Sequence, residues 1–85
     1  MGIPEFQKQQ HDDRGVSIAR LISSEFGSSE PTVRHQLDKK ETVIEIDGEV
    51  WNGDRRFIPR DRLLGKTLTV IGPERHWRMK YPETY

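Results

Sequence analysis

The sequence has no cysteine, no long apolar run and no net excess of either charge. Without cysteine the 85-residue chain can form neither a disulfide framework nor a thiolate zinc site, which favours an intracellular protein, cytoplasmic or nuclear, over a small secreted one. No apolar run reaches the roughly 18 to 20 residues of a transmembrane helix, and no signal-peptide pattern opens the chain. We therefore expect a soluble protein without a membrane partner.

Catalytic and metal-binding patterns are also missing from the sequence. The histidines, His11, His35 and His76, are far apart and lack the spacing of metal ligands, and the chain has no glycine-rich phosphate loop and no nucleophile elbow. A chain of this length builds one compact core and leaves little room for a deep cleft. We expect a binding module rather than an enzyme, with no cofactor, metal or small-molecule substrate.

The sequence predicts a single domain with a polar margin. Residues 1–6 (MGIPEF) look like translated cloning sequence, and residues 7–15 are mostly polar and without a period, as a disordered lead-in would be. Residues 16–85 are expected to form the domain.

Two helices are expected at the start of this domain. Residues 16–26 place apolar side chains at three- and four-residue steps, and Gly27 predicts the end of that helix. The run Ser28-Ser29-Glu30-Pro31 offers a hydroxyl cap, an acid and a first-turn proline, which predicts a second helix over residues 30–39. This second helix has only two apolar residues at helical spacing, Val33 and Leu37, so we expect it to be stabilised by packing against the first helix.

Beyond residue 40 the pattern changes to that of antiparallel strands. Residues 42–46 (TVIEI) are β-branched and end at Asp47-Gly48, a strong hairpin signal, after which residues 50–51 run to a second turn at Asn52-Gly53. Residues 56–59 predict an edge strand closed by proline, and residues 66–71 predict a further strand. The chain thus predicts an α+β fold, with two N-terminal helices followed by a small antiparallel sheet of three to five strands.

The last predicted strand, residues 76–81, alternates strictly between apolar and basic side chains. Its apolar residues share one face: Trp77, Met79 and Tyr81. Its basic residues share the other: His76, Arg78 and Lys80. One face of this strand should join the core, and the other should be basic.

Charge is divided between the two halves of the chain. Residues 1–50 carry six Lys and Arg against ten Asp and Glu, a net of −4, whereas residues 51–85 carry eight against four, a net of +4. A neutral domain with one anion-facing surface would show this asymmetry. So would a fold whose halves attract each other, or one in which Asp54, Asp61 and Glu74 neutralise the arginines around them.

Residues 21–37 (LISSEFGSSEPTVRHQL) resemble the helix-turn-helix of GntR-type winged-helix regulators. Ser23 stands at the helix crossing and Gly27 at the turn, while the Pro-Thr-Val-Arg run is the most specific element. Ser28 departs from the family pattern, which has an apolar residue there. The resemblance implies a winged-helix-like fold in which the following strands form a wing. The groove-facing residues that it implies are Ser29, Thr32, Arg34 and His35. An ordinary helical pair with a capped turn is the alternative.

A second resemblance covers residues 52–59, 64–70 and 77–81, which look like the small SH3-like barrel near the C-terminus of transposases and integrases. It also implies contact with nucleic acid, and such a barrel could include residues 32–37 as a strand, which conflicts with the helix-turn-helix. The contact residues that it implies are Arg55, Arg56, Arg60, Arg62 and Lys66.

Both resemblances imply DNA as a partner. We expect a DNA-binding domain of a transcriptional regulator or mobile-element protein, with the second helix in the major groove and sheet arginines on phosphates. Further contacts are expected from Arg75, Arg78 and Lys80, and the aromatic residues interleaved with these bases are Phe57, Trp77 and Tyr81. The alternative is a protein-interaction module with a small SH3-like β-barrel. Its sheet would present Trp51, Trp77 and Tyr85 to a partner chain.

Overall fold

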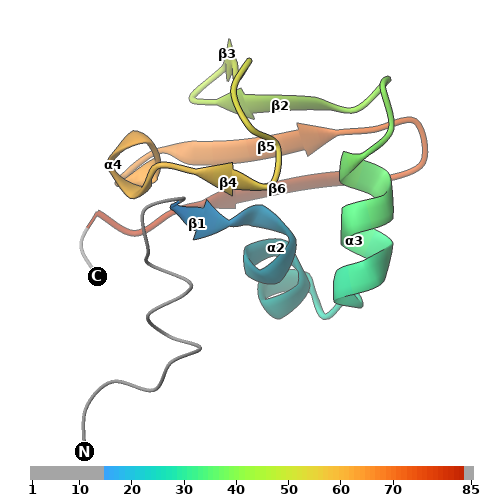
Figure 1. The fold of residues 1–85 in the computed structure, drawn as a ribbon. Helices are drawn as coiled ribbons and strands as arrows, with labels where there is room; N and C mark the ends of the chain where they lie inside the picture. The colour runs from blue at the N-terminus through green and yellow to red at the C-terminus, as the bar shows by residue number, and fades with distance from the viewer. Residues whose placement is uncertain (1–14, 84–85) are drawn as a thin grey trace, which may run out of the picture.

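The computed structural model describes residues 15–83, which form an α+β fold (Figure 1). The elements along the chain are β1 (Val16–Ser17), α2 (Ile18–Phe26), α3 (Glu30–Leu37), β2 (Val43–Ile46), β3 (Glu49–Val50), β4 (Phe57–Ile58), α4 (Arg60–Leu63), β5 (Thr67–Ile71) and β6 (His76–Lys80). One antiparallel sheet has the strand order β3-β2-β5-β6, and β1 pairs with β4 in a second, two-stranded sheet. The predicted α+β class with a small antiparallel sheet is confirmed. The predictions for residues 1–14 concern chain outside the described residues.

The first helix begins two residues later than predicted. Val16 and Ser17 form β1, which pairs with β4 through Val16 opposite Ile58 and Ser17 opposite Phe57. An apolar period cannot reveal this pairing, because the partner strand lies about forty residues further along the chain. The end of α2 is as predicted. Gly27 adopts the left-handed conformation with φ of 71°, and its N–H donates to the carbonyl of Ser23 at 2.9 Å.

The second helix, α3, also follows its local signals at the start. The hydroxyl of Ser29 accepts a hydrogen bond from the N–H of Thr32 at 3.3 Å, and Pro31 stands in the first turn. The strand that the SH3-like resemblance could place over residues 32–37 is therefore wrong, since these residues are helical. The helix ends at Leu37 rather than at residue 39, and the Arg55 guanidinium donates to the carbonyls of Leu37 and Lys39 at this end.

The hairpin of β2 and β3 has the turn that Asp47 and Gly48 predict. Both residues have positive φ, 52° and 83°, and Ile46 pairs directly with Glu49 across the two-residue loop. These values describe a type I′ turn, whose twist matches that of the flanking strands. The predicted edge strand at residues 56–59 is β4, which joins β1 instead of the large sheet. The short helix α4 was not predicted, because four residues are too few to show a helical period.

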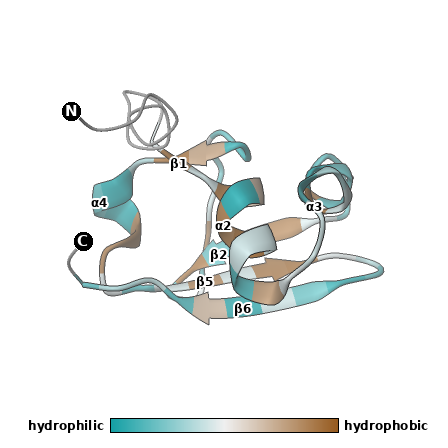
Figure 2. Cartoon of the chain, turned by 90° about the horizontal axis from the view of Figure 1, so that it is seen from below, coloured by the Kyte–Doolittle hydropathy of each residue, from teal (hydrophilic) through white to brown (hydrophobic). Residues whose placement is uncertain are grey.

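The core lies between the large sheet and the two helices, α2 and α3, which cover one of its faces (Figure 2). The fully buried apolar side chains come from the two helices, the sheet and the segment of β4 and α4, and they include Ile18, Ile22, Val33, Ile44, Ile58, Leu63, Leu68, Val70 and Tyr81. Phe26 does not belong to it, since its side chain is 43% exposed at the end of α2. The apolar face of that helix therefore ends at Ile22.

The alternation predicted for the last strand is confirmed. Trp77 and Tyr81 are buried and Met79 is packed against the core, while the basic residues of the strand are exposed: His76, Arg78 and Lys80. The period of two along β6 thus separates an apolar inner face from a basic outer face.

Candidate nucleic-acid interface

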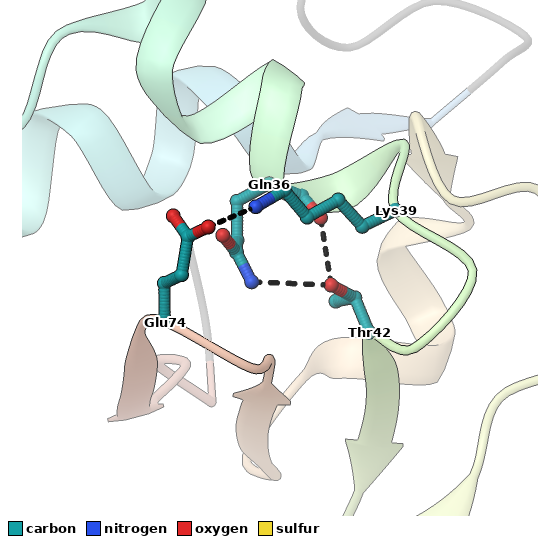
Figure 3. A network of polar contacts seen from close by, with 4 residues as sticks. All are labelled: Gln36, Lys39, Thr42 and Glu74. Carbon is teal, nitrogen blue, oxygen red and sulfur yellow. Dashed lines mark hydrogen bonds and ion pairs between the residues drawn. The ribbon is translucent and has the colours of Figure 1, made fainter.

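A buried polar pair fixes the end of α3 against the start of β2 (Figure 3). The Thr42 hydroxyl donates to the main-chain carbonyl of Gln36 at 2.7 Å and accepts from its Nε2 at 3.2 Å. Both residues are buried, so each partner satisfies the other where water has no access. This pair holds α3 in one position on the sheet.

A second contact joins α3 to the turn between β5 and β6. Lys39 Nζ donates to a carboxylate oxygen of Glu74 (Figure 3). The hydrogen bond and the charge of Lys39 lower the pKa of Glu74, and the nearby charges of His35 and Arg75 lower it further. One carboxylate is thus surrounded by three basic side chains. We call His35, Lys39, Glu74 and Arg75 the α3–turn cluster.

The residues predicted to face a groove from α3 occupy different situations. The hydroxyls of Ser29 and Thr32 lie 2.6 Å apart and serve the helix cap. Arg34 lies 3.9 Å from Glu30, an acid that also approaches Arg20 at 3.7 Å, so the charge of Arg34 is partly balanced. His35 is exposed within the α3–turn cluster.

The clearest basic surface follows the edge strand β6. Arg75, Arg78 and Lys80 are exposed, and none of them makes an ion pair within residues 15–83. β6 runs from the turn, where His76 pairs with Ile71, to the opposite end of the sheet, where Lys80 pairs with Thr67. We call Arg75, Arg78 and Lys80 the basic track. It begins at the α3–turn cluster and ends beside Lys66, whose carbonyl accepts from the N–H of Tyr81.

The uncovered face of the sheet is polarised. A groove of about 450 Å³ lies there, and β2 with its turn contributes acids while β6 contributes bases, with threonines of β5 between them. The polar side chains lining it are Glu45, Asp47, Thr67, Thr69, His76 and Arg78. The charge asymmetry of the sequence has thus become a separation in space, with the basic side at the free edge.

The halves of the chain do not neutralise each other in the way that their net charges suggest. The pair of Lys39 and Glu74 joins a base of the acidic half to an acid of the basic half. Asp54 accepts from the main-chain N–H of Arg56 at 2.8 Å. Neither acid forms an ion pair with the basic track, although the charge of Arg75 acts on Glu74 and Arg78 shares its groove with Glu45.

The other predicted contacts lie elsewhere. Arg60 and Arg62 belong to α4, with Lys66 just beyond it, and all three are exposed at the end of the sheet opposite α3 (Figures 1 and 2). Arg55 is half-buried and donates from Nη1 to the carbonyls of Leu37 at 3.1 Å and Lys39 at 2.8 Å. Its guanidinium closes α3, a role that sequence reasoning missed because the acceptors lie 16 and 18 residues away.

The predicted aromatic surface is largely absent. Trp77 and Tyr81 are buried in the core, so the interpretation of these two rings as surface contacts is wrong, and Phe57 is half-buried. The protein-interaction alternative loses Trp77 for the same reason, and Tyr85 lies outside the described residues. Trp51 is half-buried and keeps part of its ring exposed.

Two further properties concern the described part of the chain. Among residues 15–83 no helix is long and apolar enough to cross a membrane. The same residues contain no group of three or more His, Asp or Glu side chains placed to hold a metal ion. Comparison with protein-family models, curated proteins and solved structures found no match to this chain.

Proposed function

We propose that this domain binds duplex DNA, with the basic track on the sugar-phosphate backbone. The observation that supports the proposal is the row of Arg75, Arg78 and Lys80 along one exposed sheet edge, without an ion pair inside residues 15–83. Cations that are not engaged within the protein can displace the counterions condensed on DNA, and this release supplies much of the affinity. Arginine adds a planar fork that matches phosphate oxygens.

The position of α3 suggests a winged-helix-like mode of binding. α3 follows α2 after a three-residue turn, and the pair of Lys39 and Glu74 holds it beside the β5–β6 turn. In this mode α3 enters the major groove and the β5–β6 hairpin acts as the wing. In this mode we expect Arg34 and His35 to contact base edges, since Ser29 and Thr32 serve the helix cap.

The salt dependence of binding tests the electrostatic part of this proposal. Three phosphate contacts give a slope of about −2.7 in log affinity against log salt, which is roughly a 40-fold loss between 50 and 200 mM. Fluorescence anisotropy with a labelled random-sequence duplex measures this slope. A flat salt response, or no binding at 50 mM, would reject DNA and favour a protein partner.

Charge variants locate the contact surface. The double variant Arg78→Gln/Lys80→Gln should retain one phosphate contact from the basic track. Its affinity for the duplex should then fall only about 3.5-fold between 50 and 200 mM salt. The matched control is Lys40→Gln/Arg56→Gln, which removes the same charge from exposed positions outside the track. Equal weakening by both pairs would show that net charge, and not this edge, determines binding.

Sequence preference tests the role of α3. Duplexes enriched from a random pool should bind more tightly than unselected duplexes, and His35→Ala should remove that preference while leaving the salt slope unchanged. His35 is exposed, so this substitution should leave the core undisturbed. An unchanged preference in His35→Ala and Arg34→Ala together would reject α3 as the recognition helix.

A further inference from the structure

The half-buried Trp51 is held rigidly by its own loop. Its indole Nε1 donates to the main-chain carbonyl of Asp54 at 3.0 Å, so the single polar atom of the ring is already satisfied. Gly53 lies against the ring so closely that a Cβ added there would stand 2.3 Å from Cζ2. The ring therefore has a fixed orientation and an exposed part that needs no hydrogen bond, which are the properties of a stacking surface.

This ring belongs to a pocket between the β2–β3 hairpin and α4. The pocket measures about 120 Å³, and its lining combines an apolar wall with charged side chains: Ile46, Glu49, Val50, Trp51, Arg62 and Lys66. Val50 is 56% exposed, an unusual exposure for a valine in a strand. The apolar wall thus remains open to a ligand.

The two cations of the pocket come from α4 and the residues just after it. Neither Arg62 nor Lys66 makes an ion pair within residues 15–83, and Glu49 is the acid among the lining residues. The pocket consequently carries more positive than negative charge next to its aromatic wall. A planar ring with an attached anion matches this combination better than an apolar or a purely anionic ligand does.

Its size restricts what part of a ligand enters. Sites that enclose a whole drug-sized ligand measure about 300–1,000 Å³, whereas this pocket holds about 120 Å³. One planar ring system fits inside, and the remainder of the molecule must lie on the surface beside the cations.

We infer that this pocket binds an unpaired nucleotide, with the base stacked on Trp51 and the phosphate between Arg62 and Lys66. Arg62 of the pocket belongs to α4, which lies at the end of the sheet opposite α3 (Figure 1), and the pocket shares no lining residue with the basic track, so it is a different site from the proposed duplex interface. The nucleotide is either free or part of a single strand, since both supply the same base and phosphate. Stacking accepts every base, so the site has little base preference.

The test is a titration of the full chain observed through its two indole N–H signals. Deoxyadenosine 5′-monophosphate should shift the Trp51 signal and leave that of the buried Trp77 in place. Deoxyadenosine without phosphate should bind at least about tenfold more weakly, which corresponds to roughly 1.4 kcal/mol. A tetranucleotide that binds more tightly than the monophosphate identifies single strands as the source, and equal affinities identify the free nucleotide.

Variants separate this site from the duplex interface. Arg62→Gln/Lys66→Gln changes exposed residues only and should remove the preference for the monophosphate over the nucleoside. Trp51→Leu should weaken the tetranucleotide by at least about fivefold, the lower end of what base stacking contributes. Arg78→Gln/Lys80→Gln should leave both measurements unchanged while it weakens duplex binding.

Three results would overturn the inference. They are monophosphate shifts that map to the basic track, no shift of the Trp51 signal with either nucleotide probe, and an acidic aromatic dipeptide that binds the pocket more tightly than the monophosphate. None of these results depends on whether the duplex binds, so the two proposals fail separately.

Discussion

Replacing Thr42 by valine should destabilise the domain by about 1 to 3 kcal/mol, although the two side chains have nearly the same shape. The Thr42 hydroxyl is buried, donates to the Gln36 carbonyl at 2.7 Å and accepts from Gln36 Nε2 at 3.2 Å. Valine removes both bonds at once. Gln36 Nε2 is then left in the core without a partner, at a cost of about 1–3 kcal/mol, whereas the Gln36 carbonyl still accepts from the N–H of Lys39 at 3.2 Å. The added methyl group recovers part of the loss.

This loss is large for a domain of this length, in which 1 kcal/mol shifts Tm by roughly 4–8 °C. Urea unfolding followed by tryptophan fluorescence measures it, because Trp77 is buried and becomes exposed on unfolding. The control is Thr42→Ser, which keeps the hydroxyl and should lose only about 1 kcal/mol for the missing methyl group. A valine variant within about 0.5 kcal/mol of the wild type would refute the reasoning.

The double variant Gln36→Leu/Thr42→Val checks the cause. Leucine removes the side-chain amide that valine would leave without a partner, and the Gln36 carbonyl keeps the N–H of Lys39, so the two substitutions should together cost less than the sum of their separate effects. Additive losses would show that the hydroxyl and the amide act independently, contrary to the geometry of Figure 3.

Two further predictions concern the backbone and a surface charge. Gly15→Ala should lower the free energy of unfolding by about 2–3 kcal/mol in urea, because Gly15 has φ of 98° and the new Cβ would stand 2.4 Å from the carbonyl oxygen of Ile58. The control Gly27→Ala has φ of 71° with open space around it and should cost about 1 kcal/mol. Equal losses in the two variants would contradict the steric argument. Glu74→Gln should lower the urea midpoint at pH 7. Lys39 lowers the pKa of Glu74 in the folded state, so the ionised Glu74 stabilises the fold above the pKa that it has in the unfolded chain. This stabilisation is lost as pH falls through the pKa of the folded state. The difference in urea midpoint between Glu74→Gln and the wild type should therefore shrink below pH 4.5. A difference that is constant with pH would contradict this assignment.

Features that depend on a few neighbouring residues could be predicted from the sequence. The end of α2 at Gly27, the cap of α3 at Ser29 and the type I′ turn at Asp47 and Gly48 each rest on the conformational preference of one or two residues. The two faces of β6 likewise follow from the alternation of its own side chains. For this reason the basic side chains Arg78 and Lys80 were correctly expected at the surface.

Features that depend on distant partners were decided only by the tertiary structure. Val16 and Ser17 form a strand because β4 lies beside them in the fold. The guanidinium of Arg55 donates its hydrogen bonds to carbonyls at the end of α3. The sequence likewise does not distinguish the two tryptophans: Trp77 is enclosed when the helices cover one face of the sheet, whereas Trp51 stays half-exposed in a loop beside Arg62. The sequence by itself therefore determined the local elements and the alternation of the last strand, since a few φ and ψ preferences suffice for them. Packing decided which basic side chains and aromatic rings remain accessible to a ligand, because burial and ion pairing arise only between segments that the completed fold brings together.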